Sequence, residues 1–419
     1  MYHRTILDNG LKIISEPMDH MRSVSLGIWV NAGSRDELEE ESGISHFIEH
    51  MSFKGTKKRS SLQIAKELDA IGGFSNAFTG KEHTCFHAKV LSKDLKTLSD
   101  IFTDLFLNSS FDPEDLERER QVILQEINMV EDAPDENIHV IFNHLLWKDH
   151  PIGLSILGTD KTVRAIQRKD ILRYMKQFYI PQRIMVVAAG NVNHDTLVST
   201  FKPCLEAREG GRKSPERTIP GSHSRVSVQA KDLEQVHICL GGSAPSQIGE
   251  DRFAATLLNT ILGGTMSSRL FQEIREKQGL AYVVYSFLSA YADTGMLGIY
   301  VASEARQVNP VLRTIHREIE KIKKGSLSAS DLASAREHLI GSIYLGSEST
   351  DNRMMRNARN EFIFERYVPY GELVAGLEKV SVDEVIDVAN RIFQDPHMSL
   401  AVLGPIREEA LDRDSLSFH

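Results

Sequence analysis

Two histidines and a glutamate, His46, Glu49 and His50, occur in the order H-x-x-E-H. At 100° per residue these three side chains share one side of a helix, opposite an apolar stripe. Histidines at positions i and i+4 lie one above the other, so both imidazoles can reach one zinc ion at roughly 2.0–2.1 Å. Glu49 is then placed to accept a proton from a water molecule bound to that metal. The apolar stripe, which predicts a core-facing side, consists of Ile44, Phe47, Ile48 and Met51.

A histidine pair on a helix is as often solvated or hydrogen-bonded as metal-bound. The motif therefore predicts a metal site only together with a third ligand. Asp112 and Pro113 predict the start of a helix, as N-cap and first residue, that runs over about 114–131. Glu119 and Glu126 lie on one face of this helix, roughly 10 Å apart along its axis, so one ion cannot bind both directly. The spacing by itself does not choose between them, and a solvated acidic face is the alternative.

Several further elements are predicted around this motif. Asn9-Gly10 between two short apolar runs predicts a hairpin. The helix that carries the motif should end by Gly55. Alternation of polar and apolar residues, or a continuous apolar run, predicts strands over 24–30 and 182–192, and segment 74–90 is expected to form two strands around a polar turn. Helical spacing predicts helices over 61–71 and 95–107.

The composition describes an ordinary globular protein. Of 419 residues, 41% are hydrophobic and 26% are charged, and this length favours two domains. The formal net charge of −9 argues against nucleic-acid binding. The three scattered cysteines, without C-x-x-C spacing, are expected to be reduced. We find no signal or transit peptide and no membrane-spanning run, so a cytoplasmic location is expected, with no membrane partner.

The second half of the sequence repeats the first. The strand at 24–28 is echoed 212 residues later at 236–240, and the strand at 184–192 is echoed 214 residues later at 398–406. Segment 89–95 is matched near 300–306 at a similar offset. This order predicts a duplicated α/β unit. At the offset of 212, the three motif positions become Leu258, Ile261 and Leu262, so only the first half should bind a metal.

This duplication predicts an α+β protein with three parts. Residues 1–205 form the N-terminal zinc-binding catalytic domain, and residues 206–225 form a linker without apolar periodicity. Residues 226–419 form a C-terminal duplicated domain without a zinc site. Each domain is expected to be a mostly antiparallel sheet with helices packed on it.

Over essentially its whole length the sequence resembles the pitrilysin-type inverzincin zinc peptidases, and four segments, in order and spread over both halves, carry the resemblance. Among these the sequence is most similar to the β-subunit of the mitochondrial processing peptidase and to bacterial processing-protease-like relatives. The segments are Gly43 to Thr56, Gly72 to Thr79, Glu117 to Ile127, and Ser268 to Tyr282. The resemblance implies two homologous domains that form half of a clam-shell chamber, and one Zn²⁺ per chain.

The resemblance also implies roles for single residues. It makes Glu126, 76 residues after His50, the third zinc ligand, and Glu119 an auxiliary carboxylate of the catalytic site. A substrate strand would pair with the edge strand that contains Asn76, Ala77 and Phe78. Arg275 and Tyr282 would reach from the second half to the scissile peptide as catalytic residues.

The expected activity is that of a zinc metalloendopeptidase. Its substrates would be unstructured peptides or presequence-like segments, bound as an extended strand. A homodimer is expected, since one chain carries both the zinc motif and the Arg275 and Tyr282 pair. The alternatives are one subunit of a hetero-pair peptidase and a non-catalytic structural or core subunit of the same fold.

Overall fold

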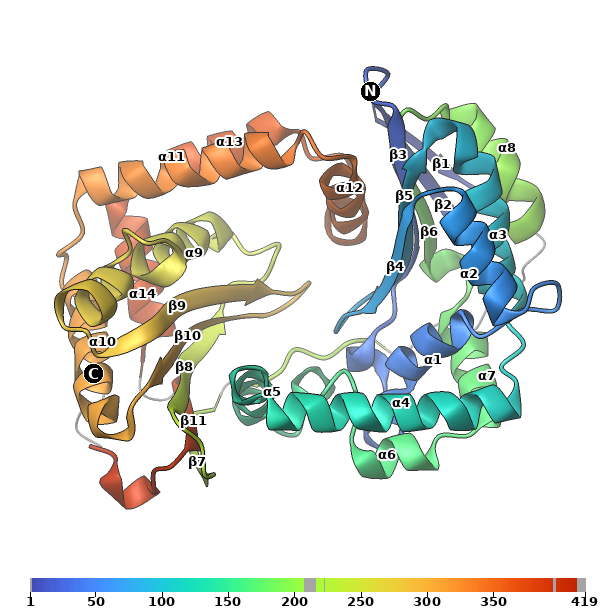
Figure 1. The fold of residues 1–419 in the computed structure, drawn as a ribbon. Coiled ribbons are helices and arrows are strands. Elements are labelled where there is room, and N and C mark those ends of the chain that lie inside the picture. Colours follow the sequence, from blue (N-terminus) through green and yellow to red (C-terminus); the bar gives the residue numbers. More distant parts are fainter. Residues whose placement is uncertain (1, 207–215, 222, 395–396, 413–419) are drawn as a thin grey trace. The chain divides into compact units, whose positions relative to one another are not determined.

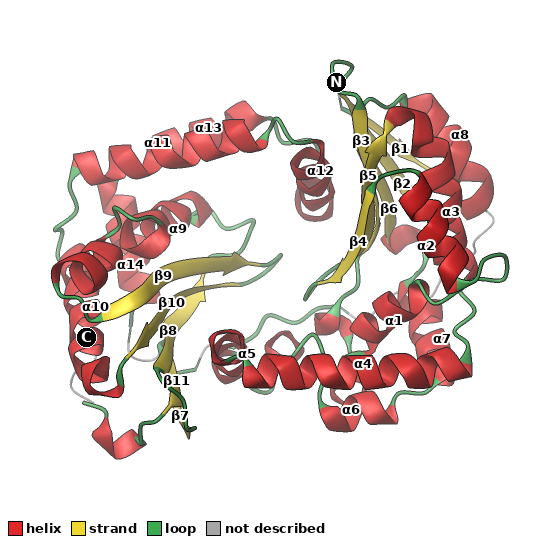
Figure 2. Ribbon diagram, viewed as in Figure 1, coloured by secondary structure: helices red, strands yellow, loops and turns green. Residues whose placement is uncertain are grey.

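The chain of the computed structural model is described over residues 2–206, 216–221, 223–394 and 397–412. It divides into two compact units, each with one sheet (Figures 1 and 2). The first unit comprises Met1–Met129, Leu154–Arg217 and Leu345–Tyr367. The second unit comprises Val130–Gly153, Thr218–Tyr344 and Val368–His419.

These units differ from the predicted contiguous division at 206–225. Residues 130–153 belong to the second unit and residues 345–367 to the first, so each half of the sequence contributes a helix to the other unit. Helical periodicity shows that a helix has an apolar face, but not which sheet that face covers. Of the predicted linker, residues 207–215 and 222 lie outside the described residues.

The sheet of the first unit has the strand order β1-β2-β6-β3-β5-β4. All neighbouring strands are antiparallel except β2 and β6, which are parallel. The hairpin predicted at Asn9-Gly10 joins β1 to β2, with Gly10 at φ +90°. The strands are β1 (His3–Ile6), β2 (Lys12–Pro17), β3 (Ser23–Val30), β4 (Phe74–Thr79), β5 (Thr84–Leu91) and β6 (Ile184–Gly190).

Helices cover both faces of this sheet. The larger core lies between one face and the helices of the first half, and it includes Leu26, Ile28, Phe47, Ile48 and Phe102. Figure 1 shows α12 beside the strands of the first unit. The helices of this unit are α1 (Ile44–Ser52), α2 (Ser61–Ala70), α3 (Leu95–Asn108), most of α4 (Pro113–Asp132), α6 (Asp160–Ala165), α7 (Arg168–Phe178), α8 (His194–Leu205) and α12 (Thr350–Phe364).

The sheet of the second unit has the order β7-β11-β8-β10-β9, again antiparallel except at one pair, β7 and β11. The strands are β7 (Arg225–Ala230), β8 (Val236–Ala244), β9 (Ala281–Ala290), β10 (Gly295–Ser303) and β11 (Ser399–Gly404). Its helices are α5 (Pro134–Leu146), α9 (Arg252–Asn259), α10 (Val308–Lys323), nearly all of α11 (Ala329–Gly346), α13 (Tyr370–Lys379) and α14 (Val382–Ile392). Two π-helical segments, Thr260–Gly264 and Phe271–Lys277, follow α9.

The two sheets support the predicted duplication. The echoed segments form β3 and β8, β5 and β10, and β6 and β11, which occupy corresponding places in the two strand orders. The single parallel pair also falls at the same place. The predicted apolar counterparts of the motif, Leu258, Ile261 and Leu262, are all buried in the core of the second unit. The predicted fold class, two duplicated α+β units with mostly antiparallel sheets, is therefore confirmed.

Helix α12 is fixed to the first unit by apolar and ionic contacts. Met354 and Ala358 pack with Trp29 of β3 on the sheet face opposite α1. The carboxylate of Glu361 is fully buried and accepts hydrogen bonds from Arg4, while the ammonium group of Lys12 lies 2.8 Å from it. Burial by itself would raise the pKa of Glu361, but these two cations outweigh it and hold the pKa below its usual range.

No helix of the described residues is long and apolar enough to cross a membrane.

We expect Glu361→Gln to lower the free energy of unfolding of the first unit by about 2–3 kcal/mol at pH 7, because it leaves two cations without their buried counter-charge. Since the folded-state pKa is depressed below the ordinary 4.5, this stabilisation is present above about pH 4.5 and lost as the pH falls through the folded value. Urea unfolding followed by Trp29 fluorescence, in a Trp147→Phe background, measures the effect.

The matched control for this prediction is Glu365→Gln in the same segment. The Glu365 side chain is 75% exposed and lies 3.4 Å from Lys12, so its removal should cost less than about 1 kcal/mol. Equal losses for the two variants, or a loss for Glu361→Gln that does not shrink below pH 4.5, would contradict the prediction.

Candidate metal centre

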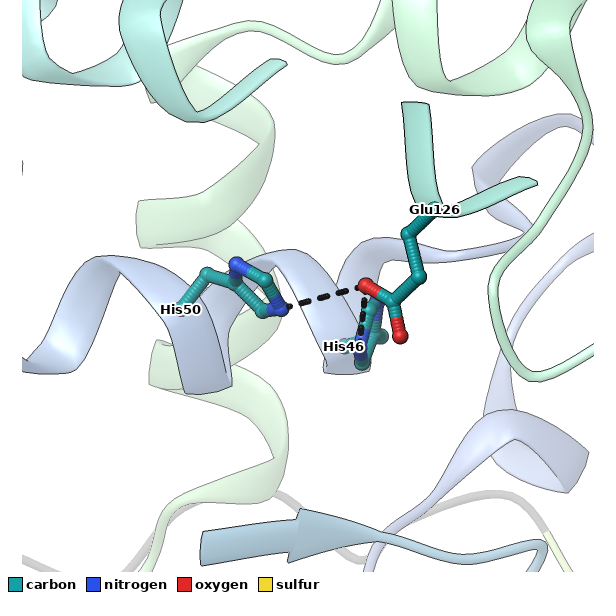
Figure 3. Close-up of side chains that lie close together, drawn as sticks. All are labelled: His46, His50 and Glu126. Atoms are coloured by element: carbon teal, nitrogen blue, oxygen red, sulfur yellow. Dashed lines mark ion pairs between the residues drawn. The ribbon is translucent and has the colours of Figure 1, made fainter. Parts of the chain in front are cut away.

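The chemical face of α1 meets α4. The Nε2 atom of His46 lies 3.6 Å, and that of His50 3.5 Å, from the Oε2 atom of Glu126 (Figure 3). One ligand atom of each residue lies within 4.8 Å of the other two. Ligands held 2.0–2.1 Å from a tetrahedral zinc ion lie roughly 3.4 Å apart. The donor set and these separations therefore fit a zinc ion.

Burial and charge set the protonation of the two imidazoles. Burial, helped by the charge of His50, lowers the pKa of His46 to about 4, which keeps this imidazole in the neutral form that binds metals. Burial would also lower the pKa of His50, but Glu126 and Glu119 outweigh it and the pKa is raised. The hydrogen bond from His50 lowers the pKa of Glu126. A metal ion would thus compete with a proton at His50.

Glu119 lies behind His50. Its Oε2 atom is 3.2 Å from the Nδ1 atom of His50, and its Oε1 atom is 2.6 Å from the ammonium nitrogen of Lys54. A carboxylate that accepts a hydrogen bond from the far ring nitrogen of a histidine fixes the ring and leaves its other nitrogen free for a metal. Glu119 and Glu126 thus face different sides of His50, a distinction that the sequence spacing leaves open.

Glu49 lies on the same face of α1 and is oriented by a strand. Its Oε2 atom accepts a hydrogen bond of 2.6 Å from the hydroxyl of Thr79, the last residue of β4. Burial raises the pKa of Glu49 and the charge of Glu126 raises it further, whereas the Thr79 hydroxyl and His50 lower it. The sequence offered no signal for Thr79, because this contact depends on how β4 packs against α1.

The N-terminus of α1 is capped from a distance. Its N-cap, Gly43, has φ 96° and no side chain to cap the helix, and a Cβ there would lie 2.6 Å from the carbonyl oxygen of Leu157. The buried carboxylate of Glu37 instead accepts hydrogen bonds of 2.8 Å from the N–H groups of Gly43 and Ser45. Burial raises the pKa of Glu37 to about 8, although these donors lower it. No spacing rule identifies such a cap.

The predicted substrate strand is an edge strand. β4 pairs with β5, and in this pairing Asn76 lies opposite His87 and Phe78 lies opposite Cys85. The other edge of β4 has no strand partner in the described sheet. Asn76 is exposed and its Oδ1 atom accepts a hydrogen bond from the N–H of Ala77. Phe78 packs edge-on against Trp29.

The last two predicted residues lie together in the second unit. The guanidinium carbon of Arg275 is 4.5 Å from the ring centre of Tyr282 and 4.9 Å from that of Phe271. Residue Tyr282 is 72% exposed. This pair thus forms a cation–π contact at the surface of its own unit.

Comparison with known proteins identifies the class of this chain. Residues 12–160 match the family described as "Insulinase (Peptidase family M16)", and residues 165–339 match "Peptidase M16 inactive domain". The chain therefore belongs to the insulinase family of peptidases, family M16.

Among its relatives is the "Uncharacterized zinc protease YmxG" of Bacillus subtilis, 37% identical over 97% of this chain and 98% of the relative. An uncharacterized zinc protease of Streptomyces coelicolor is 38% identical over 98% of this chain and 91% of the relative. The crystal structure of a protease from Helicobacter pylori has the same fold, with a TM-score of 0.89 at 22% identity over 97% of this chain and 99% of that one. Similarity to the mitochondrial processing peptidase in particular stays a prediction.

We expect the protein to bind one zinc ion, and we expect Glu126→Gln to weaken zinc binding more than about 100-fold. Loss of a hydrogen-bond partner of a metal ligand typically costs roughly 10–100-fold in affinity, and loss of a ligand itself should cost more. Competition titration against a chromophoric zinc chelator measures the affinity. Glu114→Gln in the first turn of α4, where the side chain is 86% exposed, serves as the control. Wild-type affinity in Glu126→Gln would contradict the ligand assignment.

Proposed function

We propose that this protein is a zinc-dependent endopeptidase with His46, His50 and Glu126 as metal ligands. The observation that carries the proposal is the convergence of three ligand atoms, two imidazole and one carboxylate, within 4.8 Å of one another. Two histidines and one glutamate leave the fourth position of a tetrahedral ion open, as in catalytic zinc sites. Relatives at 37–38% identity that are named zinc proteases support it.

Glu49 is the general base in this proposal. When bound, zinc polarises the scissile carbonyl and acidifies the attacking water. Glu49 accepts the proton of that water and returns it to the leaving amine. The raised pKa of Glu49 suits both steps, since the group must take up a proton and then release it. Thr79 holds the carboxylate in one orientation through its 2.6 Å hydrogen bond.

The free edge of β4 is the proposed binding site for the peptide backbone. An extended peptide adds to a sheet edge through main-chain hydrogen bonds, and Asn76, Ala77 and Phe78 lie on this strand. Because Thr79 ends the same strand and contacts Glu49, β4 links substrate binding to the general base. Folded proteins expose few free strands, so unstructured peptides or presequence-like segments are the proposed substrates. Arg275 and Tyr282 are proposed to contact the peptide backbone or the developing oxyanion.

We expect the zinc-loaded wild type to cleave a mixed library of unstructured peptides, and Glu49→Gln to lower kcat at least 1,000-fold while it retains zinc. Loss of a general base typically costs 10²–10⁴-fold, and the isosteric amide keeps the shape of the site. Mass spectrometry of the products and metal analysis of both proteins make the measurement.

Glu67→Gln on α2 provides the control, because this carboxylate pairs with Arg59 away from the metal centre. Stoichiometric zinc without wild-type cleavage would contradict the endopeptidase proposal. It would favour a non-catalytic subunit of the same fold, or a peptidase that needs a second kind of chain.

We also propose a homodimer, since one chain carries both the candidate metal centre and the Arg275 and Tyr282 pair. Light scattering after size-exclusion chromatography should give about twice the chain mass of 47.1 kDa. A strict monomer that cleaves peptides would overturn this proposal.

A further inference from the structure

Glu119 is a buried carboxylate with two proton-donating neighbours, His50 on α1 and Lys54 just beyond the end of α1. It is 5% exposed. His50 and Lys54, four residues apart, reach its two oxygens separately, at 3.2 Å and 2.6 Å. Burying a carboxylate is unfavourable unless its charge is paired and its oxygens accept hydrogen bonds. Lys54 supplies the charge, and His50 supplies the second donor.

The position of Lys54 follows from the geometry of α1. His46 and His50 lie one turn apart on α1, and Lys54 lies two residues past its last residue, Ser52, in a turn in which the Lys54 N–H donates a hydrogen bond to the carbonyl oxygen of Met51. On α4, Glu126 and Glu119 are seven residues apart and face the same way. Glu126 meets His46 and His50, and Glu119 meets His50 and Lys54. Lys54 also lies just beyond the C-terminus of α1, where the helix dipole favours a cation.

From these contacts we propose that Lys54 is a positioning residue that raises zinc affinity by acting through Glu119. The inference rests on the proposed function. Lys54 fixes one oxygen of Glu119, so the other oxygen is held toward the Nδ1 atom of His50. That nitrogen then carries the proton, which leaves the Nε2 atom available to bind the metal.

The other histidine shows why the effect acts through His50. Within the described chain, the Nδ1 atom of His46 is buried and has no hydrogen-bond partner. The orientation of His46 therefore depends on packing, whereas His50 is held by a hydrogen bond that Lys54 supports. Removal of Lys54 should leave the His50 ring less firmly oriented. We expect zinc affinity to fall by roughly 10–100-fold, as when a hydrogen-bond partner of a metal ligand is lost.

We expect Lys54→Met to weaken zinc binding 10–100-fold in the full-length protein, measured by competition with a chromophoric chelator. Peptide cleavage should fall at limiting zinc and recover with excess zinc. Lys54→Arg, which keeps a cation within reach of Glu119, should restore most of the affinity. The thermal midpoint of each protein in the presence of a chelator reports separately on folding.

Lys58→Met is the matched control, since Lys58 is exposed four residues further along the chain. In a Glu119→Gln background, Lys54→Met should have no further effect, because Lys54 acts only through that carboxylate. Wild-type affinity in Lys54→Met, or additive losses in the double variant, would overturn the inference while leaving the proposed function intact. A wild type that binds no zinc would overturn both.

Discussion

The contact between α1 and α4 is the constraint on which the rest of the first unit depends. It places two imidazoles and an ammonium group against two carboxylates in a partly buried layer, which is stable only if each charge has a partner in good geometry. Small displacements of either helix would leave a buried carboxylate unpaired. Much of the surrounding structure accordingly fixes α1, including the Glu37 cap and the contact of Thr79 with Glu49.

Duplication explains why only one unit carries this layer. The five strands of the second sheet follow the same order as β2-β6-β3-β5-β4 of the first, and the single parallel pair falls at the same place. In the second unit, Leu258, Ile261 and Leu262 occupy the positions of the motif and are buried in an apolar core. Apolar packing avoids the desolvation of charged groups, so the second copy needs neither carboxylate partners nor a remote cap. The second unit instead has a cation–π contact between Arg275 and Tyr282 at its surface.

The exchange of helices follows from the sheets themselves. The central strands carry apolar residues on both faces, so each sheet must be covered twice to remain buried. The helices of the first half cover one face of the first sheet, and α12 covers the other. In the second unit, α5 packs on a sheet face through Ile138, Phe142 and Leu146. Glu361 helps to select the first sheet as the partner of α12, because its carboxylate pairs with Arg4 and Lys12 of the β1–β2 hairpin.

The sequence by itself determined the features that depend on neighbours along the chain. The spacing of His46, Glu49 and His50 defined a chemical face, periodicity predicted strands and helices, and segments echoed in the same order at a nearly constant offset predicted the duplication. Tertiary structure decided which of Glu119 and Glu126 faces both imidazoles, and it added Lys54, Thr79 and Glu37 to the surroundings of α1. It also decided which sheet α5 and α12 cover. These contacts join residues that are distant in sequence or on different elements, and their geometry is set by packing rather than by local spacing.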